Sequence, residues 1–230
     1  MRKIFLPFCI ILSLKLSAQF DPDKIKLGIH SGLSFFGQED LKSINQEFKK
    51  QLPFETEIID DFKPVLFFGG YSQYELLNRF ALGPVYEYHY AGSRLGARDY
   101  SGIFSFDQYI KSHQIGMKFS YSLISEPQKA FIVEMNTGIN ITKWKTDTKL
   151  EIGEEGFFLQ QDKDNFTGKS WNVTPAIRYI YKIINPVSLF GNLAYSFDLA
   201  GKYIYEEDKS LDVTKAPHWG GLKVSIGVEF

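Results

Sequence analysis

The feature that most constrains this chain is an alternation of apolar and polar residues that recurs along its length. In residues 114–123 every odd position is apolar or aromatic, and every even position is polar or small. A period of two places successive side chains on opposite faces of a β-strand. Seven further segments alternate in the same way, 64–75 less regularly than the others: residues 25–35, 64–75, 80–90, 133–142, 172–183, 188–199 and 221–230. The sequence therefore predicts an all-β fold of eight strands.

The two faces of the predicted strands differ in a way that indicates a membrane barrel. The polar face consists mainly of glycine and small residues with a few charges, which suits the crowded interior of a narrow barrel. The other face is large and aromatic-rich, in a chain that is 16% aromatic, and it suits contact with lipid. A soluble barrel would instead bury its large apolar face. A soluble periplasmic barrel that binds an apolar ligand therefore remains an alternative.

The connections between the predicted strands alternate in length. Short turns are expected at residues 77–79, 125–129 and 185–186, which are rich in Asn and Pro. Long polar segments are found between them: residues 37–62, 91–108, 145–170 and 201–217. This pattern predicts an eight-stranded antiparallel up-and-down transmembrane β-barrel with four long extracellular loops and short periplasmic turns.

Two of the predicted loops contain apolar residues of their own. In the first loop, Leu41, Ile44 and Phe48 have helical spacing, which predicts a short amphipathic helix over Glu39–Gln51. This helix would cap the barrel mouth or dock a partner. In the third loop, Gly156–Leu159 is an apolar cluster among acids. It would extend the strands as a hairpin or offer a contact surface.

Residues 1–18 have the organisation of a secretory signal peptide. The basic start Met1–Lys3 precedes an apolar run from Ile4 to Leu14, and Ala18 is a small residue at the expected cleavage site. The run is too short to span a bilayer; a buried N-terminal strand or helix is the alternative. Residues 19–230 would then form the barrel domain, and Cys9, the only cysteine, would be removed.

Composition excludes several other classes of protein. A single cysteine cannot provide an intrachain disulfide or a cysteine-based zinc site. The formal charge of -1 and the lack of a basic cluster give no indication of nucleic-acid binding. Asp162–Asn165 resembles the start of a calcium loop, but the twelfth position is Val173 and not an acid. We therefore expect no metal site and no cofactor.

Both the tryptophans and the C-terminus fit a barrel in a membrane. Each tryptophan is found at the end of a predicted strand beside a long loop, so we expect an outer aromatic belt of Trp144, Trp171 and Trp219. The last segment resembles the terminal-strand signal of bacterial outer-membrane proteins, which the barrel-assembly machinery recognises. The residues that carry this assembly signal are Leu222, Val224, Ile226, Val228 and Phe230. An ordinary terminal edge strand is the alternative.

These segments, together with aromatic-rich strands such as Leu27–Gly32, resemble the small outer-membrane β-barrels of Bacteroidota known as the PorT-like group. The architecture also resembles the OmpA and OmpX barrels. The resemblance lies in pattern and composition over nearly the whole chain after the signal peptide, without a catalytic motif. It implies fold and an outer-membrane location. Some members of the group assist type IX secretion.

The best candidate site is a set of charges on the inward face. The predicted strands place four charged side chains inside the barrel, and the charges on neighbouring strands have opposite sign: Glu87, Lys118, Glu134 and Arg178. Because unpaired buried charges are costly, we expect a lumenal charge network that closes the barrel to solutes. A path for protons or ions is the functional alternative.

The histidines provide the second candidate site. His30 and His89 are expected to face inward, and His218 lies near the last loop. Outer-membrane lipid-modifying enzymes use a histidine with a serine and an acid, but the His-x-Ser-Asn spacing of the deacylases is absent. We predict a non-enzymatic structural or protein-interaction component, for example an accessory of secretion or surface attachment. Its expected partners are lipid, lipopolysaccharide and an envelope protein at the long loops; a lipid-modifying enzyme is the alternative.

Overall fold

The computed structural model describes residues 21–100, 102–153, 158–210 and 213–230. The predicted signal peptide (residues 1–18), Cys9 and part of the apolar cluster (Gly156 and Phe157) lie outside these residues. Among the described residues, no helix is both long and apolar enough to cross a membrane. The elements, in chain order, are η1 (Pro22–Lys24), β1 (Ile25–Phe36), α2 (Glu39–Gln51), β2 (Glu57–Asp61), β3 (Val65–Leu77), β4 (Phe80–Asp99), β5 (Gly102–Ser125), β6 (Lys129–Ile152), β7 (Phe158–Ile184), β8 (Val187–Tyr205) and β9 (Gly221–Glu229).

Eight of these strands form a closed antiparallel ring. The hydrogen-bonded order is β4-β3-β1-β9-β8-β7-β6-β5, and β5 pairs back to β4. The first and last strands meet along a continuous register from Gly28↔Glu229 to Phe36↔Gly221. The short strand β2 is not part of the ring; among the described residues its strand partner is β4, at residues 93–96. The predicted fold class, an eight-stranded antiparallel barrel, is confirmed, and each predicted strand coincides with a strand of the ring.

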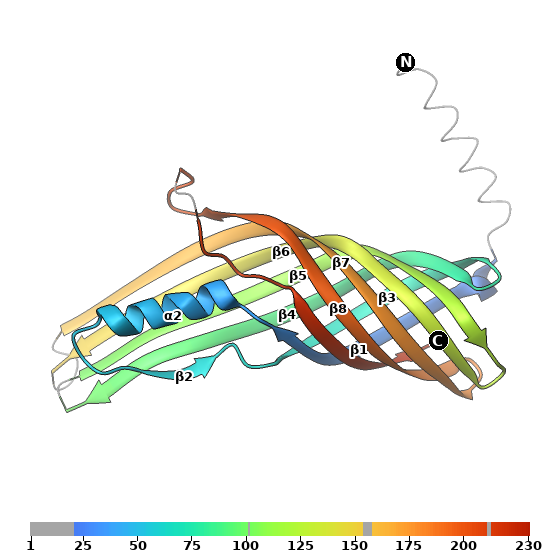
Figure 1. Ribbon diagram of the computed structural model, residues 1–230, viewed down its shortest axis with the longest axis horizontal. Coiled ribbons are helices and arrows are strands. Elements are labelled where there is room, and N and C mark those ends of the chain that lie inside the picture. Colours follow the sequence, from blue (N-terminus) through green and yellow to red (C-terminus); the bar gives the residue numbers. More distant parts are fainter. Residues whose placement is uncertain (1–20, 101, 154–157, 211–212) are drawn as a thin grey trace, which may run out of the picture.

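The connections match the prediction at the turn end and differ at the other end. The three short turns are present, but two of the expected loops are strands. β4 and β5 pair as far as Asp99↔Gly102, which includes most of residues 91–108. β6 and β7 pair as far as Ile152↔Phe158, which includes most of residues 145–170. The four longest strands therefore extend past their neighbours (Figure 1); we call this part the extension.

The β6–β7 part of the extension agrees with one of the two roles predicted for Gly156–Leu159, a hairpin that extends the strands. The β4–β5 part was expected to be a loop, although its inner face buries Leu95, Phe104 and Phe106. Residues 146–149 read Thr-Asp-Thr-Lys and are paired with Asp162–Asp164 and Gln161. Where both faces of a sheet are polar, as over residues 146–149, the sequence carries no alternating hydrophobic signal. Pairing continues there because each hairpin keeps the register that the barrel strands set. Most of the predicted loops 91–108 and 145–170 is therefore hydrogen-bonded β-sheet.

The barrel wall is apolar outside and polar inside. Every strand of the ring exposes large apolar or aromatic side chains on its outer face, for example Ile29, Phe68, Tyr86, Met117, Met135, Ile177, Phe197 and Val224. Every strand also buries polar side chains on the inner face, for example Ser34, Gln73, Glu87, Lys118, Glu134, Arg178, Ser196 and Lys223. We call the outer apolar surface the apolar band. This arrangement is the opposite of a soluble barrel with an oily core.

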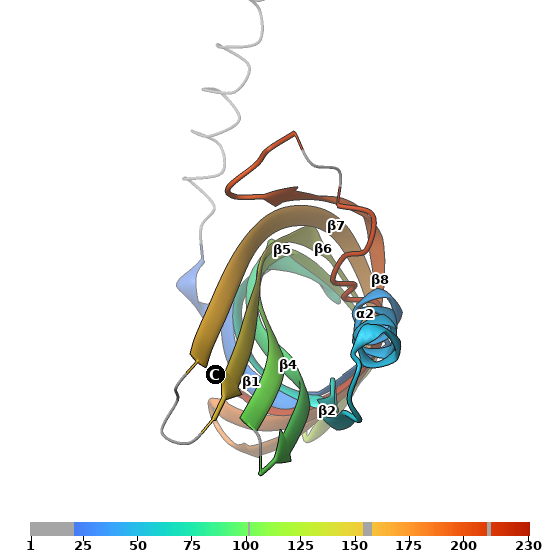
Figure 2. The same ribbon diagram turned by 90° about the vertical axis from the view of Figure 1, so that its left-hand side faces the viewer.

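The predicted helix is present with the predicted bounds, and it packs inside the mouth of the barrel. Viewed from the extension, the long strands form an open curve, and α2, seen end-on, and β2 lie at one side, in the gap between the two edges of that curve (Figure 2). Leu41 is fully buried, and the Phe48 and Phe106 rings stack with centroids 4.4 Å apart. The Gln108 side chain donates to Asn45 Oδ1 at 2.8 Å, which ties the helix to β5. The helix therefore caps the barrel mouth, one of its two predicted roles.

Candidate functional site: the lumenal charge network

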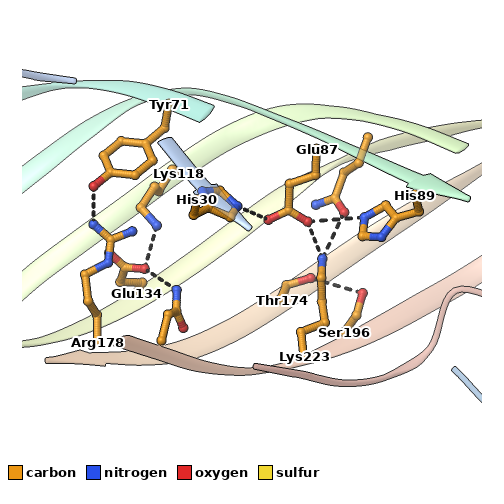
Figure 3. A network of polar contacts seen from close by, with 12 residues as sticks. His30, Tyr71, Glu87, His89, Lys118, Glu134, Thr174, Arg178, Ser196 and Lys223 are labelled. Carbon is orange, nitrogen blue, oxygen red and sulfur yellow. Dashed lines mark hydrogen bonds and ion pairs between the residues drawn. The ribbon is translucent and has the colours of Figure 1, made fainter. Parts of the chain in front are cut away.

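The four predicted lumenal charges, Glu87, Lys118, Glu134 and Arg178, all lie buried inside the ring. They come from β4, β5, β6 and β7, and Figure 3 shows Lys118 and Arg178 beside Glu134, with Glu87 in a separate group. The two-residue alternation explains this placement, because all four occupy the inward parity of their strands. They divide into two clusters, each with further partners from β1, β3 and β9.

The first cluster lies toward the turn end and is centred on Glu134. Lys118 Nζ donates to Glu134 Oε2 at 2.5 Å, and Arg178 Nε lies 3.0 Å from Glu134 Oε1. The side chains of Lys118 and Glu134 are 2% and 0% exposed. A carboxylate between two cations in so dry a site is strongly stabilised by both.

Tyr71 and Glu229 complete this first cluster. The Tyr71 hydroxyl donates to Glu229 Oε2 at 2.6 Å and accepts from Arg178 Nη1 at 2.5 Å. The Arg178 guanidinium also lies over the Phe190 ring, 4.1 Å from its centroid. Gly28 makes room for this arrangement, since a Cβ there would overlap the Tyr71 ring. The barrel is thus bridged from β3 to β7 and β9 by one tyrosine.

The second cluster is centred on Glu87 of β4. Lys223 of β9 donates to Glu87 Oε2, and the Nε2 atoms of His30 and His89 each lie 3.3 Å from a Glu87 oxygen. Lys223 Nζ also contacts Gln114 Oε1 at 3.4 Å. The prediction paired the charges of neighbouring strands, but the cationic partner of Glu87 comes from across the lumen.

The network balances its charges internally. The first cluster contains two cations, Lys118 and Arg178, and two carboxylates, Glu134 and Glu229. The second contains one cation, Lys223, and one carboxylate, Glu87. Such pairing avoids the large penalty of an isolated buried charge. The result is a rigid polar filling of the lumen, and the cavity at the turn end has a volume of only about 80 Å³.

The structure corrects the predicted outer aromatic belt at two of its three positions. Trp171 is 60% exposed on the outer face, but Trp144 and Trp219 are 4% and 2% exposed and lie inside the mouth. Their cluster also contains Phe36, Leu41 and Ile110. Trp144 has the same inward parity as Thr142 and Asn140, so the alternation itself contained the signal. Trp219 is held inside because its indole N–H donates to Thr142 Oγ1 at 2.8 Å.

The assembly-signal residues lie on the last strand and its end. Leu222, Val224, Ile226 and Phe230 expose their side chains on the outer face, and Val228 has the same outward parity on β9. The backbone of Phe230 pairs with that of Leu27 in both directions, at 2.8 and 3.1 Å. The terminal segment therefore closes the ring against the first strand. Recognition by the assembly machinery remains a prediction.

The histidine at the rim has an acid partner. His218 Nδ1 lies 3.1 Å from Asp198 Oδ2, and the Trp219 backbone N–H donates to the same oxygen at 2.8 Å. The hydrogen bond to Asp198 raises the pKa of His218 above its usual value. Within the described residues, His30, His89 and His218 form no hydrogen bond with a serine or threonine hydroxyl. In the same part of the chain no group of three or more His, Cys, Asp or Glu is arranged to hold a metal ion.

Sequence reasoning missed Tyr71, Lys223 and Glu229, and it did not connect the inward-facing His30 and His89 with Glu87. Tyr71, Lys223 and Glu229 have the inward parity of their strands, and so does His30, but their mutual contacts depend on which strands face one another across the ring. That depends on barrel closure and shear. Alternation alone could have identified them as inward-facing, but not as partners.

Comparisons with known proteins found similarities to solved structures alone. No protein-family profile matches, and no curated protein matches in sequence. Among solved structures, the chain is similar to Ail, the attachment invasion locus protein of Yersinia pestis (11% identity, 90% of this chain and 96% of that chain, TM-score 0.35). It is also similar to Neisserial surface protein A (8% identity, 89% and 94%, TM-score 0.40). A third similar structure is a major outer membrane protein from Thermus thermophilus (12% identity, 90% and 99%, TM-score 0.44).

Proposed function

We propose that this chain is a bacterial outer-membrane protein with a closed lumen that acts as a structural or protein-binding component at the cell surface. The observation that carries the proposal is the filled interior: the charge network occupies the lumen, and α2 with its aromatic cluster occupies the mouth. A barrel filled in this way offers no route for solutes, so its function is expected on its outer surfaces.

The apolar band supports the membrane part of this proposal. Contiguous exposed apolar surface of this extent is rare on soluble proteins. The soluble ligand-binding alternative needs an apolar cavity inside the ring, whereas the described lumen contains buried ion pairs and packed apolar clusters. The expected export route is cleavage after residue 18, followed by insertion through the barrel-assembly machinery. Membership of the PorT-like group of Bacteroidota is part of the same proposal.

The extension is the surface on which a partner would bind. In the extension the paired strands β4–β7 continue beyond the apolar band. Its outer face carries ion pairs such as Arg94–Asp107 and Lys163–Asp147. A rigid sheet with exposed polar side chains suits recognition of an envelope protein better than mobile loops do, because little ordering entropy is lost on binding. Secretion and surface attachment are the accessory roles that we propose.

Site-specific labelling tests this topology in intact cells. Cys9 is the only cysteine, so single cysteines can be introduced in a Cys9→Ser background. We expect Lys163→Cys, on the extension, to react with a membrane-impermeant maleimide. Gln128→Cys, an exposed residue of a short turn, should react only after the outer membrane is permeabilised. Equal reactivity of both in a soluble periplasmic fraction would contradict the proposal and favour the soluble barrel.

The pair His218–Asp198 keeps a lipid-modifying enzyme as a second candidate. It is a histidine with an acid partner at the rim, where lipid could reach it. The test is the lipid A of cells expressing wild type or the variant His30→Ala, His89→Ala and His218→Ala. An unchanged lipid A profile is the outcome that excludes this candidate; a modification lost in the variant would replace the structural function with an enzymatic one.

A further inference from the structure

Lysines mark the boundary where the apolar band ends on four neighbouring strands. On each of β5 to β8, the first charged side chain that follows the outward apolar residues, in the direction of the extension, is a lysine. Below these lysines lie Ile115, Ile141, Trp171 and Leu199, all on the outer face. The lysines themselves are all exposed, and we call them the lysine row: Lys111, Lys143, Lys169 and Lys202.

The strand register brings these lysines together in facing pairs. Lys111 of β5 is the direct cross-strand partner of Lys143 of β6. Lys169 of β7 is likewise the direct partner of Lys202 of β8. Directly opposed side chains have Cβ atoms about 5 Å apart, and like charges at that separation destabilise a sheet. A fifth lysine, Lys145, lies on the same face two residues beyond Lys143.

The row has no acids to neutralise it. Within residues 21–100, 102–153, 158–210 and 213–230, none of the four lysines forms an ion pair; Lys111 only lies over the Tyr90 ring, 5.8 Å from its centroid. Charges further along the extension behave differently. Arg94 is paired with Asp107, and Lys163 with Asp147. The four facing lysines at the edge of the apolar band are thus a group of like charges without an acidic partner among the described residues.

We propose that the lysine row binds the phosphorylated headgroups of anionic lipids in the outer leaflet. The inference rests on the proposed membrane location. A lipid whose acyl chains lie on the apolar band would have its phosphate at the height of the row. One lipid molecule could therefore contact the apolar band with its chains and the lysines with its phosphate. Phosphate oxygens between facing lysines would remove the repulsion within each pair and form charge-assisted hydrogen bonds. Free phosphate would satisfy only the lysines.

Trp171 provides a reporter at this position. It is exposed on the outer face two residues from Lys169, whereas Trp144 and Trp219 lie inside the mouth. Lipid with brominated acyl chains quenches tryptophan on contact, so the protein can be reconstituted in vesicles that contain brominated phosphatidylglycerol or brominated phosphatidylcholine. The ratio of quenching measures the preference for the anionic lipid beside Trp171. A Trp171→Phe protein gives the signal of the two inner tryptophans, which is subtracted.

The expected result is a preference for phosphatidylglycerol of at least about fivefold, the contribution of one lysine at an anionic surface. The quadruple variant Lys111→Gln, Lys143→Gln, Lys169→Gln and Lys202→Gln should reduce the preference to about one. The matched control replaces four exposed lysines elsewhere, Lys24, Lys49, Lys50 and Lys209, and should retain it. An equal preference in the row variant and wild type would overturn the inference.

Two further arms of the experiment distinguish a lipid site from a site for free phosphate and from a failure to insert. Inorganic phosphate, compared with sodium chloride of equal ionic strength, should leave the preference in place; its loss in phosphate alone would identify a site for the soluble ion and overturn the lipid proposal. All proteins are first checked for a folded band in unheated SDS. A wild type that inserts but shows no lipid preference contradicts this inference alone, whereas a wild type that does not insert contradicts the proposed function itself.

Discussion

Lysine occurs in two contrasting environments in this barrel, and the contrast explains much of its design. Inside the lumen, Lys118 and Lys223 are buried, and each contacts a carboxylate of the same chain. On the outer face, Lys143 and Lys169 are exposed and face other lysines across the strand pairs. The same residue type on the same kind of strand is neutralised internally in one place and left positive in the other.

The difference follows from what surrounds each face. A buried cation cannot reach water or salt, so its partner has to be built into the fold. A cation at the edge of an apolar surface can take its counter-charge from the surroundings. The lumenal charges therefore concern the stability and closure of the barrel, and the outer lysines concern what the barrel contacts. Substitutions in the two regions should have effects that differ in size and in salt dependence.

The largest effect is expected when one member of the lumenal network is removed. Glu134→Leu leaves Lys118 without its ion-pair partner and leaves Arg178 with only Glu229. The free energy of unfolding should fall by about 3–5 kcal/mol. This free energy is measured by incubating the protein in increasing urea concentrations and determining the fraction that runs as the folded band in unheated SDS. The control Glu126→Gln breaks an exposed pair with Lys129 and should change stability by less than about 1 kcal/mol; similar losses in both variants would refute the distinction.

Replacement of the whole first cluster should be less harmful than removal of one carboxylate. In the variant Lys118→Met, Glu134→Leu, Arg178→Met and Glu229→Gln, no charge of this cluster is left without a partner. The protein should be more stable than Glu134→Leu by at least about 2 kcal/mol in the same urea titration. The unfolding free energy lost in the quadruple variant could instead equal the sum of the losses in the four single variants. That result would show that the destabilisation of Glu134→Leu does not come from unpaired charge.

Tyr71 bridges the first cluster, and crowding it should have an intermediate effect. Gly28→Ala places a methyl group where the Tyr71 ring lies, whereas a Cβ at Gly191 has open space around it. We expect Gly28→Ala to lower the unfolding free energy by about 1–3 kcal/mol. Gly191→Ala serves as the matched control and should be nearly neutral. Equal urea midpoints for the two variants would show that the tyrosine bridge tolerates displacement.

The smallest effect is expected in the lysine row, and its sign should be opposite. Lys143→Gln removes repulsion with Lys111 and should raise the unfolding free energy by about 0.2–1 kcal/mol in zwitterionic lipid at low salt. The gain should shrink as salt is added, because exposed charges are screened. Lys118→Gln, measured in the same way, should be destabilising at every salt concentration. A salt-independent loss for Lys143→Gln would show that this lysine is paired after all.

Much of this architecture could be predicted from the sequence, because alternation determines strands and faces directly. The positions of the eight strands, the helix Glu39–Gln51 and the inward orientation of Glu87 and Arg178 follow from periodicity. The contacts within the network do not, because Glu87 and Lys223 are distant in the chain and meet only when the ring closes. The mouth was misjudged for a different reason: Trp144 was assigned by residue type, although its parity placed it inside.

The extension shows the corresponding limit for secondary structure. The β6 and β7 strands of the extension are held by register and lie beyond the apolar band, so the sequence of residues 146–149 and 161–164 resembles that of a polar loop. The lysine row, in turn, is visible only once the register is known, because Lys169 and Lys202 are separated by a whole hairpin. The alternation in the sequence thus predicts which face of the sheet each side chain occupies. Which side chains contact one another on that face is determined by the closure of the ring.

Ion conductance is the most direct test of the closed lumen. Wild-type protein that gives a folded band in unheated SDS should be inserted into a planar bilayer at high salt. The account predicts no steady conductance steps, because paired side chains fill the interior and the apolar cluster beside α2 fills the mouth. A large, steady conductance from the folded protein would contradict the account, because it would show a continuous water-filled path through the charge network.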